Sequence, residues 1–139
     1  MVKTKKIIPI VSGTKRKSKK KKDDVADLRD AVIRGMQEKK GHEIISLDLR
    51  KTGNSVADCF IICHGSSTTQ VDALAKSVEE QVYKELKEDV AHREGFQNLE
   101  WVILDYYNVV AHIFVKESRE FYGIERLWAD AEILKVANN

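Results

Sequence analysis

The sequence is poor in cysteine, has one proline and lacks long apolar runs, and these shortages exclude several classes of protein. Cys59 and Cys63 are too few to staple a small secreted domain with disulfides. No stretch reaches the roughly 18–20 apolar residues that a membrane helix needs. The apolar run at residues 7–11 is too short for a signal peptide and contains Pro9. We therefore expect a reducing, intracellular setting without membrane contact.

Acidic residues are missing from residues 1–22, which hold ten lysines and arginines. The whole chain has 24 basic and 22 acidic residues, so residues 23–139 keep 14 basic and 22 acidic residues, a net charge of −8. A segment so poor in apolar groups cannot offset its ordering entropy, and we predict a disordered basic arm. The arm is either an RNA-contacting or targeting segment or a solvated tail. The acidic remainder argues against broad contact with nucleic-acid phosphates.

The apolar share of 42% is enough for one core, so we predict a single domain at residues 23–132 and a C-terminal tail at 133–139. Apolar periodicity predicts helices from Asp23 or Asp24 to about Gly41, over 67–88 and over 118–127, and strands over 43–49, 58–64, 91–94, 100–106 and 109–115. This order predicts an α/β (α+β) fold, a mixed sheet flanked by helices.

Metal chemistry finds little support in the sequence. Cys59 and Cys63 lie four apart in a predicted strand and share one face, whereas His64 points to the other face. Burial as small apolar side chains explains both cysteines. The four histidines show no metalloprotease spacing, and a partly buried, hydrogen-bonded ring is the expected role of His112. We expect no metal site and no cofactor.

The Gly65-Ser66 turn, between a buried strand and a helix, has two interpretations. Its backbone amides could hold a phosphate, as a Gly-Ser pair does in nucleotidyltransferases. That chemistry also needs carboxylates for a divalent metal, yet the sequence has no Asp-x-Asp pair, and Arg50 follows Asp48 closely. The second interpretation is a helix cap, because Ser67 and Gln70 have capping-box spacing. We therefore expect no enzyme.

The hairpin at residues 100–108 is the strongest candidate for function. If Val102 and Leu104 face the core, Trp101, Ile103 and Asp105 lie on the opposite face. A tryptophan with a carboxylate two places along suits an interface with a basic partner. Alternatively, Trp101 only covers the edge of the core. The charge of −8 favours the interface.

Several stretches of the sequence carry a resemblance to a known family: SVADCFIICHGSS (55–67) with Gln70-Val71, REG (93–95), EWVILDY (100–106), VVAHIF (109–114) and REFYGIERLWADA (119–131). These motifs resemble those of the ribosomal silencing factors, the Iojap-related proteins. They fall in order between about residues 24 and 132.

The resemblance implies a nucleotidyltransferase-like fold without catalytic carboxylates, and a function in translation. Family members bind protein fourteen of the large ribosomal subunit, block joining of the small subunit and lower translation when nutrients are short. They are often homodimers when free. By motif position, the partner-binding residues implied for this chain are Glu100, Trp101, Asp105, Tyr106, Asn108 and His112.

Two departures affect this assignment. The family commonly has a glycine and an acid where this chain has Tyr107 and Asn108. The basic arm lies outside the resemblance and could contact ribosomal RNA. Homologues also occur in organelles, but the arm is rich in lysine rather than in the arginine and serine of transit peptides, so we expect a bacterial cytoplasm. The alternative functions are a nucleotide-binding or residual nucleotidyltransferase protein and a nucleic-acid binder acting through residues 15–22.

Overall fold

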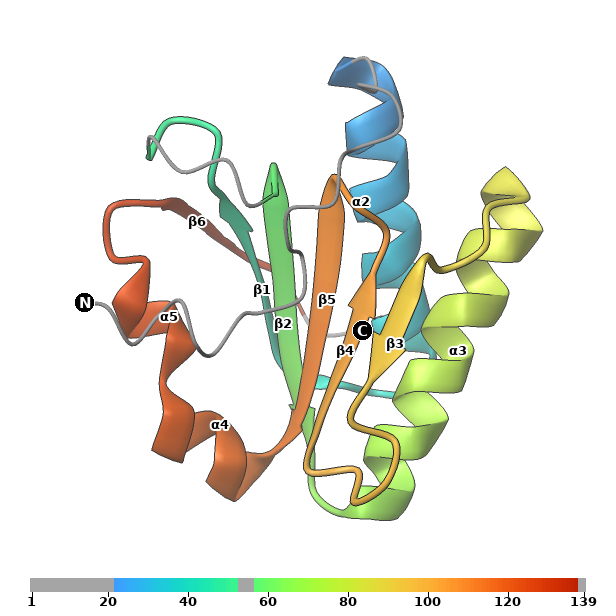
Figure 1. The fold of residues 1–139 in the computed structure, drawn as a ribbon, viewed down its shortest axis with the longest axis vertical. Helices are drawn as coiled ribbons and strands as arrows, with labels where there is room; N and C mark the ends of the chain where they lie inside the picture. The colour runs from blue at the N-terminus through green and yellow to red at the C-terminus, as the bar shows by residue number, and fades with distance from the viewer. Residues whose placement is uncertain (1–21, 53–56, 138–139) are drawn as a thin grey trace.

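The computed structural model describes residues 22–52 and 57–137. They form one mixed sheet between two layers of helices (Figure 1). The helices are α2 (Lys22–Glu38), α3 (Thr68–Leu86), α4 (Lys116–Tyr122) and α5 (Ile124–Leu127), and the strands are β1 (His42–Asp48), β2 (Cys59–Gly65), β3 (His92–Glu94), β4 (Trp101–Asp105), β5 (Val109–Val115) and β6 (Glu132–Lys135). The α/β (α+β) prediction is confirmed. The predicted arm lies outside the described residues except for Lys22, which begins α2.

The sheet order is β3-β4-β5-β2-β1-β6, and only the β2–β5 pair is parallel. The two central strands, β2 and β5, are buried along their whole length, as their continuous apolar sequences require. Helices α2 and α3 cover one face of the sheet, and α4 and α5 cover the other (Figure 1). Each face therefore has its own apolar core.

The alternation of side chains along the strands divides them between these cores. Cys59, Ile61 and Cys63 join the core beneath α2 and α3, while Phe60 and Ile62 join the core beneath α4 and α5. Both cysteines are buried free thiols, as the sequence predicted. In β4, Val102 and Leu104 face α2 and α3, so Trp101 and Ile103 face the α4 side.

The end of the domain differs from the prediction. The predicted last helix is broken at Gly123, which takes φ +52 and separates α4 from α5. Residues 133–135, assigned to a tail, instead lie in β6, which pairs antiparallel with β1. All four residues of β6 are exposed. The strand therefore lacks the alternation of buried apolar and exposed polar residues by which a strand is predicted from sequence.

In the described ranges, no helix is long and apolar enough to cross a membrane.

Candidate partner-binding face

Trp101 lies at the start of β4 on the α4 side, where other aromatic rings hold it in place. Its ring stacks on Phe114 with centroids 4.9 Å apart and contacts Tyr122 of α4 at 4.7 Å. Its indole Nε1 donates a hydrogen bond to Nδ1 of His112 at 3.1 Å. The indole remains partly exposed, so one part is fixed by packing while another faces solvent. This arrangement suits an interface anchor, because little side-chain entropy remains to be lost on binding.

Two further aromatic side chains extend the exposed surface beside Trp101. Phe121 is 79% exposed and Tyr122 is 40% exposed, and their rings meet edge to face at 5.0 Å. We call Trp101, Phe121 and Tyr122 the aromatic patch. Glu100, which precedes Trp101 in the sequence, is exposed, but it pairs with Val115, whose side chain lies in the core beneath α2 and α3. The alternation of the strand therefore directs Glu100 toward that side of the sheet and away from the patch. Exposed aromatic area of this kind is suited to a protein interface.

Helix α4, which carries two of the three aromatic residues, is anchored by the buried Arg119. The guanidinium donates to Oε2 of Glu125 at 3.0 and 2.7 Å and to the His42 carbonyl oxygen at 3.2 Å. It also donates to Nδ1 of His64 at 2.9 Å, so that nitrogen must be unprotonated. Burial and the nearby Arg119 lower the pKa of His64, which keeps the ring neutral. Phe121 and Tyr122 of the patch therefore lie on a short helix whose position on the sheet is fixed by these hydrogen bonds.

His112 lies beneath the patch and is fully buried. Burial lowers its pKa to about 3, so the ring is neutral at physiological pH. A neutral ring can accept the Trp101 hydrogen bond at Nδ1, which leaves the proton on Nε2. In this structure His112 positions Trp101 and does not itself reach the surface.

The other predicted contact residues lie at the far end of the hairpin and are buried. Asp105 is 1% exposed, and its Oδ1 accepts the Tyr107 N–H at 2.7 Å. Asn108 donates from Nδ2 to Asp58 at 3.0 Å, and its carbonyl oxygen accepts the N–H groups of Asp58 and Cys59. These groups hold the turn in shape.

Tyr106 points to the opposite side of the sheet, into the core beneath α2 and α3. The structure thus brings Trp101 and His112 together, with Glu100 next to Trp101 only along the chain, and separates them from Asp105, Tyr106 and Asn108. Asp105 is buried in this conformation, whereas the Glu100 side chain is exposed. Phe121 and Tyr122 were missed as site residues, although they lie within the REFYGIERLWADA stretch of the resemblance.

The Gly65-Ser66 turn forms a helix cap. Ser67 is the N-cap of α3, and its Oγ accepts the Gln70 N–H at 3.1 Å. The Ser66 N–H donates to Oε1 of Gln70 at 2.8 Å, so the amide that a phosphate would need is already occupied. Asp48 likewise forms two side-chain hydrogen bonds with Arg50, at 3.0 and 2.7 Å. In the described part of the chain, no three His, Cys, Asp or Glu residues are grouped as a metal site.

Comparison with known proteins decides the family. The family model described as "Ribosomal silencing factor during starvation" (RsfS) matches residues 22–139. The chain belongs to the ribosomal silencing factors. The RsfS of Bacillus subtilis is 40% identical over 96 residues, covering 69% of this chain and 80% of the relative. The RsfS of Halalkalibacterium halodurans is 32% identical over 110 residues, covering 79% of this chain and 92% of the relative.

A solved structure agrees with this assignment of the chain to the ribosomal silencing factors. A crystal structure of a Chromobacterium violaceum protein superposes with a TM-score of 0.71 at 34% identity and covers 76% of this chain and 86% of that one. As a ribosomal silencing factor, the chain is a translation-related protein with a ribosomal partner.

Proposed function

We propose that this silencing factor binds the large ribosomal subunit through protein fourteen of that subunit and sterically prevents the small subunit from joining, which represses translation. The observation that carries the proposal is the aromatic patch, because three neighbouring, partly exposed rings offer apolar area at one place on the surface. The net charge of −8 over residues 23–139 would steer the factor toward a basic ribosomal protein.

The mechanism requires only that the bound factor covers part of the surface of the large subunit, and it involves no chemical step. An interface of about 800 Å² per partner would cover the surface that the small subunit needs. Trp101 would act as the central anchor, with Phe121 and Tyr122 at its side. His112 would act through Trp101, and Asp105, Tyr106 and Asn108 would act by shaping the hairpin. We further propose that the factor works in the cytoplasm and that the free protein is a homodimer. We also propose that residues 1–22 contact ribosomal RNA.

Co-sedimentation with purified large subunits tests the proposal. The wild-type protein should travel with free large subunits, and Trp101→Ala should weaken binding by about 2 kcal/mol or more, or about 30-fold in Kd. Circular dichroism and thermal unfolding must show that the variant is folded, because Trp101 also packs on Phe114. A folded Trp101→Ala protein that binds as tightly as wild type would contradict the proposed face.

A further inference from the structure

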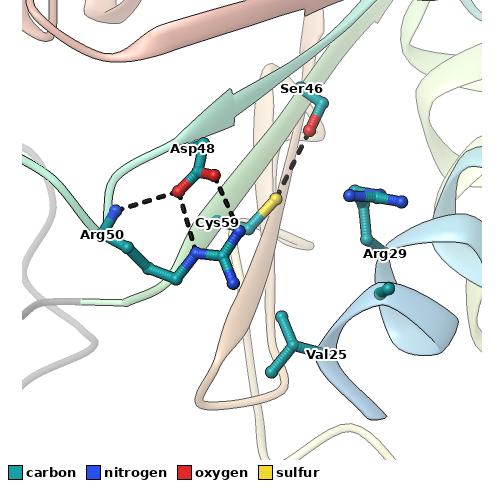
Figure 2. Close-up of a pocket in the computed structure, with 7 residues that line it drawn as sticks. Val25, Arg29, Ser46, Asp48, Arg50 and Cys59 are labelled. Atoms are coloured by element: carbon teal, nitrogen blue, oxygen red, sulfur yellow. Dashed lines mark hydrogen bonds and ion pairs between the residues drawn. The ribbon is translucent and has the colours of Figure 1, made fainter. Parts of the chain in front are cut away.

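A polar cavity of about 340 Å³ lies on the other side of the sheet from the aromatic patch. Its lining comes from the first half of α2, from β1 and the residues after it, and from the start of β2: Val25, Ala26, Arg29, Ser46, Asp48, Arg50 and Cys59. Figure 2 shows Arg29 and Arg50 on opposite sides, with Cys59 between them. The cavity therefore has two cationic walls contributed by different elements.

The cavity exists because the side chains that line its inner part are small. Ala26, Ser46 and Cys59 occupy positions where α2 faces the sheet, and Ser46 is buried next to the neighbouring strand, with its Oγ 3.4 Å from the Cys59 thiol. A leucine or isoleucine at position 46 would fill the space and contribute apolar burial. Leaving such space unfilled costs stability, which is consistent with a use for the cavity.

The hydrogen-bonding capacity of the two arginines is only partly used. Arg50 donates from Nε and Nη2 to Asp48, and Arg29 donates from Nε to Asp30 at 2.9 Å. Three nitrogen atoms have no hydrogen-bond acceptor among residues 22–52 and 57–137: Nη1 and Nη2 of Arg29, and Nη1 of Arg50. These N–H groups can therefore bind a ligand without breaking an existing contact.

The charges around the cavity limit the charge of a ligand. Arg29 is paired with Asp30 and Arg50 with Asp48, and Asp58 lies near Arg50, so the two guanidinium groups offer unused N–H donors rather than an excess of positive charge. Cys59 adds no charge, because burial raises the pKa of its thiol to about 11. A dianion would add two negative charges beside these carboxylates, whereas a carboxylate adds one and matches the planar fork of arginine.

We propose that this cavity binds a small organic carboxylate. The carboxylate accepts hydrogen bonds from Arg29 and Arg50, and a short apolar stem lies against Val25, Ala26 and Cys59. The site uses none of the residues of the aromatic patch and lies on the opposite face of the sheet, so it goes beyond the proposed ribosomal function and does not depend on it.

Titration of the full-length protein with butyrate, followed by two-dimensional NMR of backbone amides and arginine Nε–H groups, tests this site. We expect saturable shifts centred on Arg29, Ser46 and Arg50. Arg29→Met should weaken binding at least tenfold. The matched control is Arg34→Met, because Arg34 lies on the same helix but pairs with Glu85, outside the cavity; it should bind butyrate like wild type.

Two further measurements separate the carboxylate from its stem. Butyramide, which has the same shape without the charge, should not saturate the site, and Ser46→Leu should stay folded while losing butyrate binding, because leucine fills the cavity. The proposal is overturned if Arg29→Met and Arg34→Met respond alike, if butyramide binds as well as butyrate, or if inorganic phosphate displaces butyrate at lower concentrations than butyrate itself requires.

Discussion

Tyr107 lies in the left-handed region of backbone conformation, with φ +70, at the turn between β4 and β5. Its N–H donates to the Asp105 side chain, and its ring contacts His92 edge to face at 6.0 Å. A side chain at such a φ costs roughly 1 kcal/mol, a cost that glycine avoids. The glycine that the resemblance leads us to expect at this position therefore has a physical reason.

We predict that Tyr107→Gly is more stable than Tyr107→Ala by about 1 kcal/mol, because both variants lose the ring but only alanine keeps the strain. Urea unfolding measures the difference. Glu80, which is exposed within α3, provides the control. At that position the alanine variant should be more stable than the glycine variant by about 1 kcal/mol. Equal stability of the two variants at position 107 would argue against backbone strain.

His112 makes the stability of the protein depend on pH. The native pKa is about 3, whereas an unfolded histidine titrates near 6.5, so below pH 6.5 only the unfolded chain takes up the proton. Stability is therefore lost as pH falls, by about 1.4 kcal/mol per unit until the native pKa is reached. His64, whose pKa is also lowered, contributes in the same direction.

We predict that His112→Gln reduces the loss of unfolding free energy between pH 7.5 and 5.5 by about 1 kcal/mol, because glutamine does not titrate. Denaturant unfolding at the two pH values measures this, and the exposed His92→Gln serves as the control that should behave like wild type. If His112→Gln loses as much stability as wild type, the ring already titrates in the native state.

At the scale of elements, the crossing of α2 and α3 depends on Gly35. A Cβ at this position would lie 2.6 Å from the Val78 Cα and 3.0 Å from the Ser77 carbonyl oxygen. The Ser77 hydroxyl also donates to the Gly35 carbonyl oxygen at 2.8 Å. The missing side chain therefore lets the two helix backbones approach closely above the core.

Gly35→Ala should destabilise the protein by about 2 kcal/mol or more, even though alanine favours an isolated helix by about 1 kcal/mol. Thermal or urea unfolding measures the change. Glu38→Ala, on the exposed side of the same helix, should change stability by less than about 0.5 kcal/mol. A neutral or stabilising Gly35→Ala would mean that the helices separate without cost.

The sequence predicted those elements whose burial leaves a pattern in the sequence, either a helical period or a continuous apolar run. The apolar positions of α2 and α3 and the continuous runs of β2 and β5 all appear in the cores. Strand β6 escaped prediction because all four of its residues are exposed and it depends on pairing with β1.

The candidate site was predicted only in part. The period of two correctly placed Trp101 opposite Val102. The burial of Asp105 depends on the shape of the turn, and the contact of Trp101 with Tyr122 joins residues 21 positions apart, which no local pattern encodes. Replacing Asp105 by lysine would therefore disturb the fold and would not test partner binding alone.

At the scale of the whole molecule, the two faces of the sheet carry different features. The aromatic patch lies on the α4 side, and the exposed Tyr83 lies on α3, on the other side of the sheet. We predict that Phe121→Ser weakens binding to the large subunit at least fivefold, because a 79%-exposed ring contributes to an interface and little to folding. Tyr83→Ser should bind like wild type in the same co-sedimentation assay. If the two variants weakened binding to the large subunit equally, the aromatic patch would not be the docking face.

We propose that the bound factor keeps the ribosomal subunits apart. The most direct measurement mixes purified large and small subunits with saturating protein and separates the particles on a sucrose gradient. We expect separate subunits, with the protein on the large one, and joined ribosomes when Trp101→Ala replaces wild type. Joined ribosomes that carry the wild-type protein would contradict the proposal.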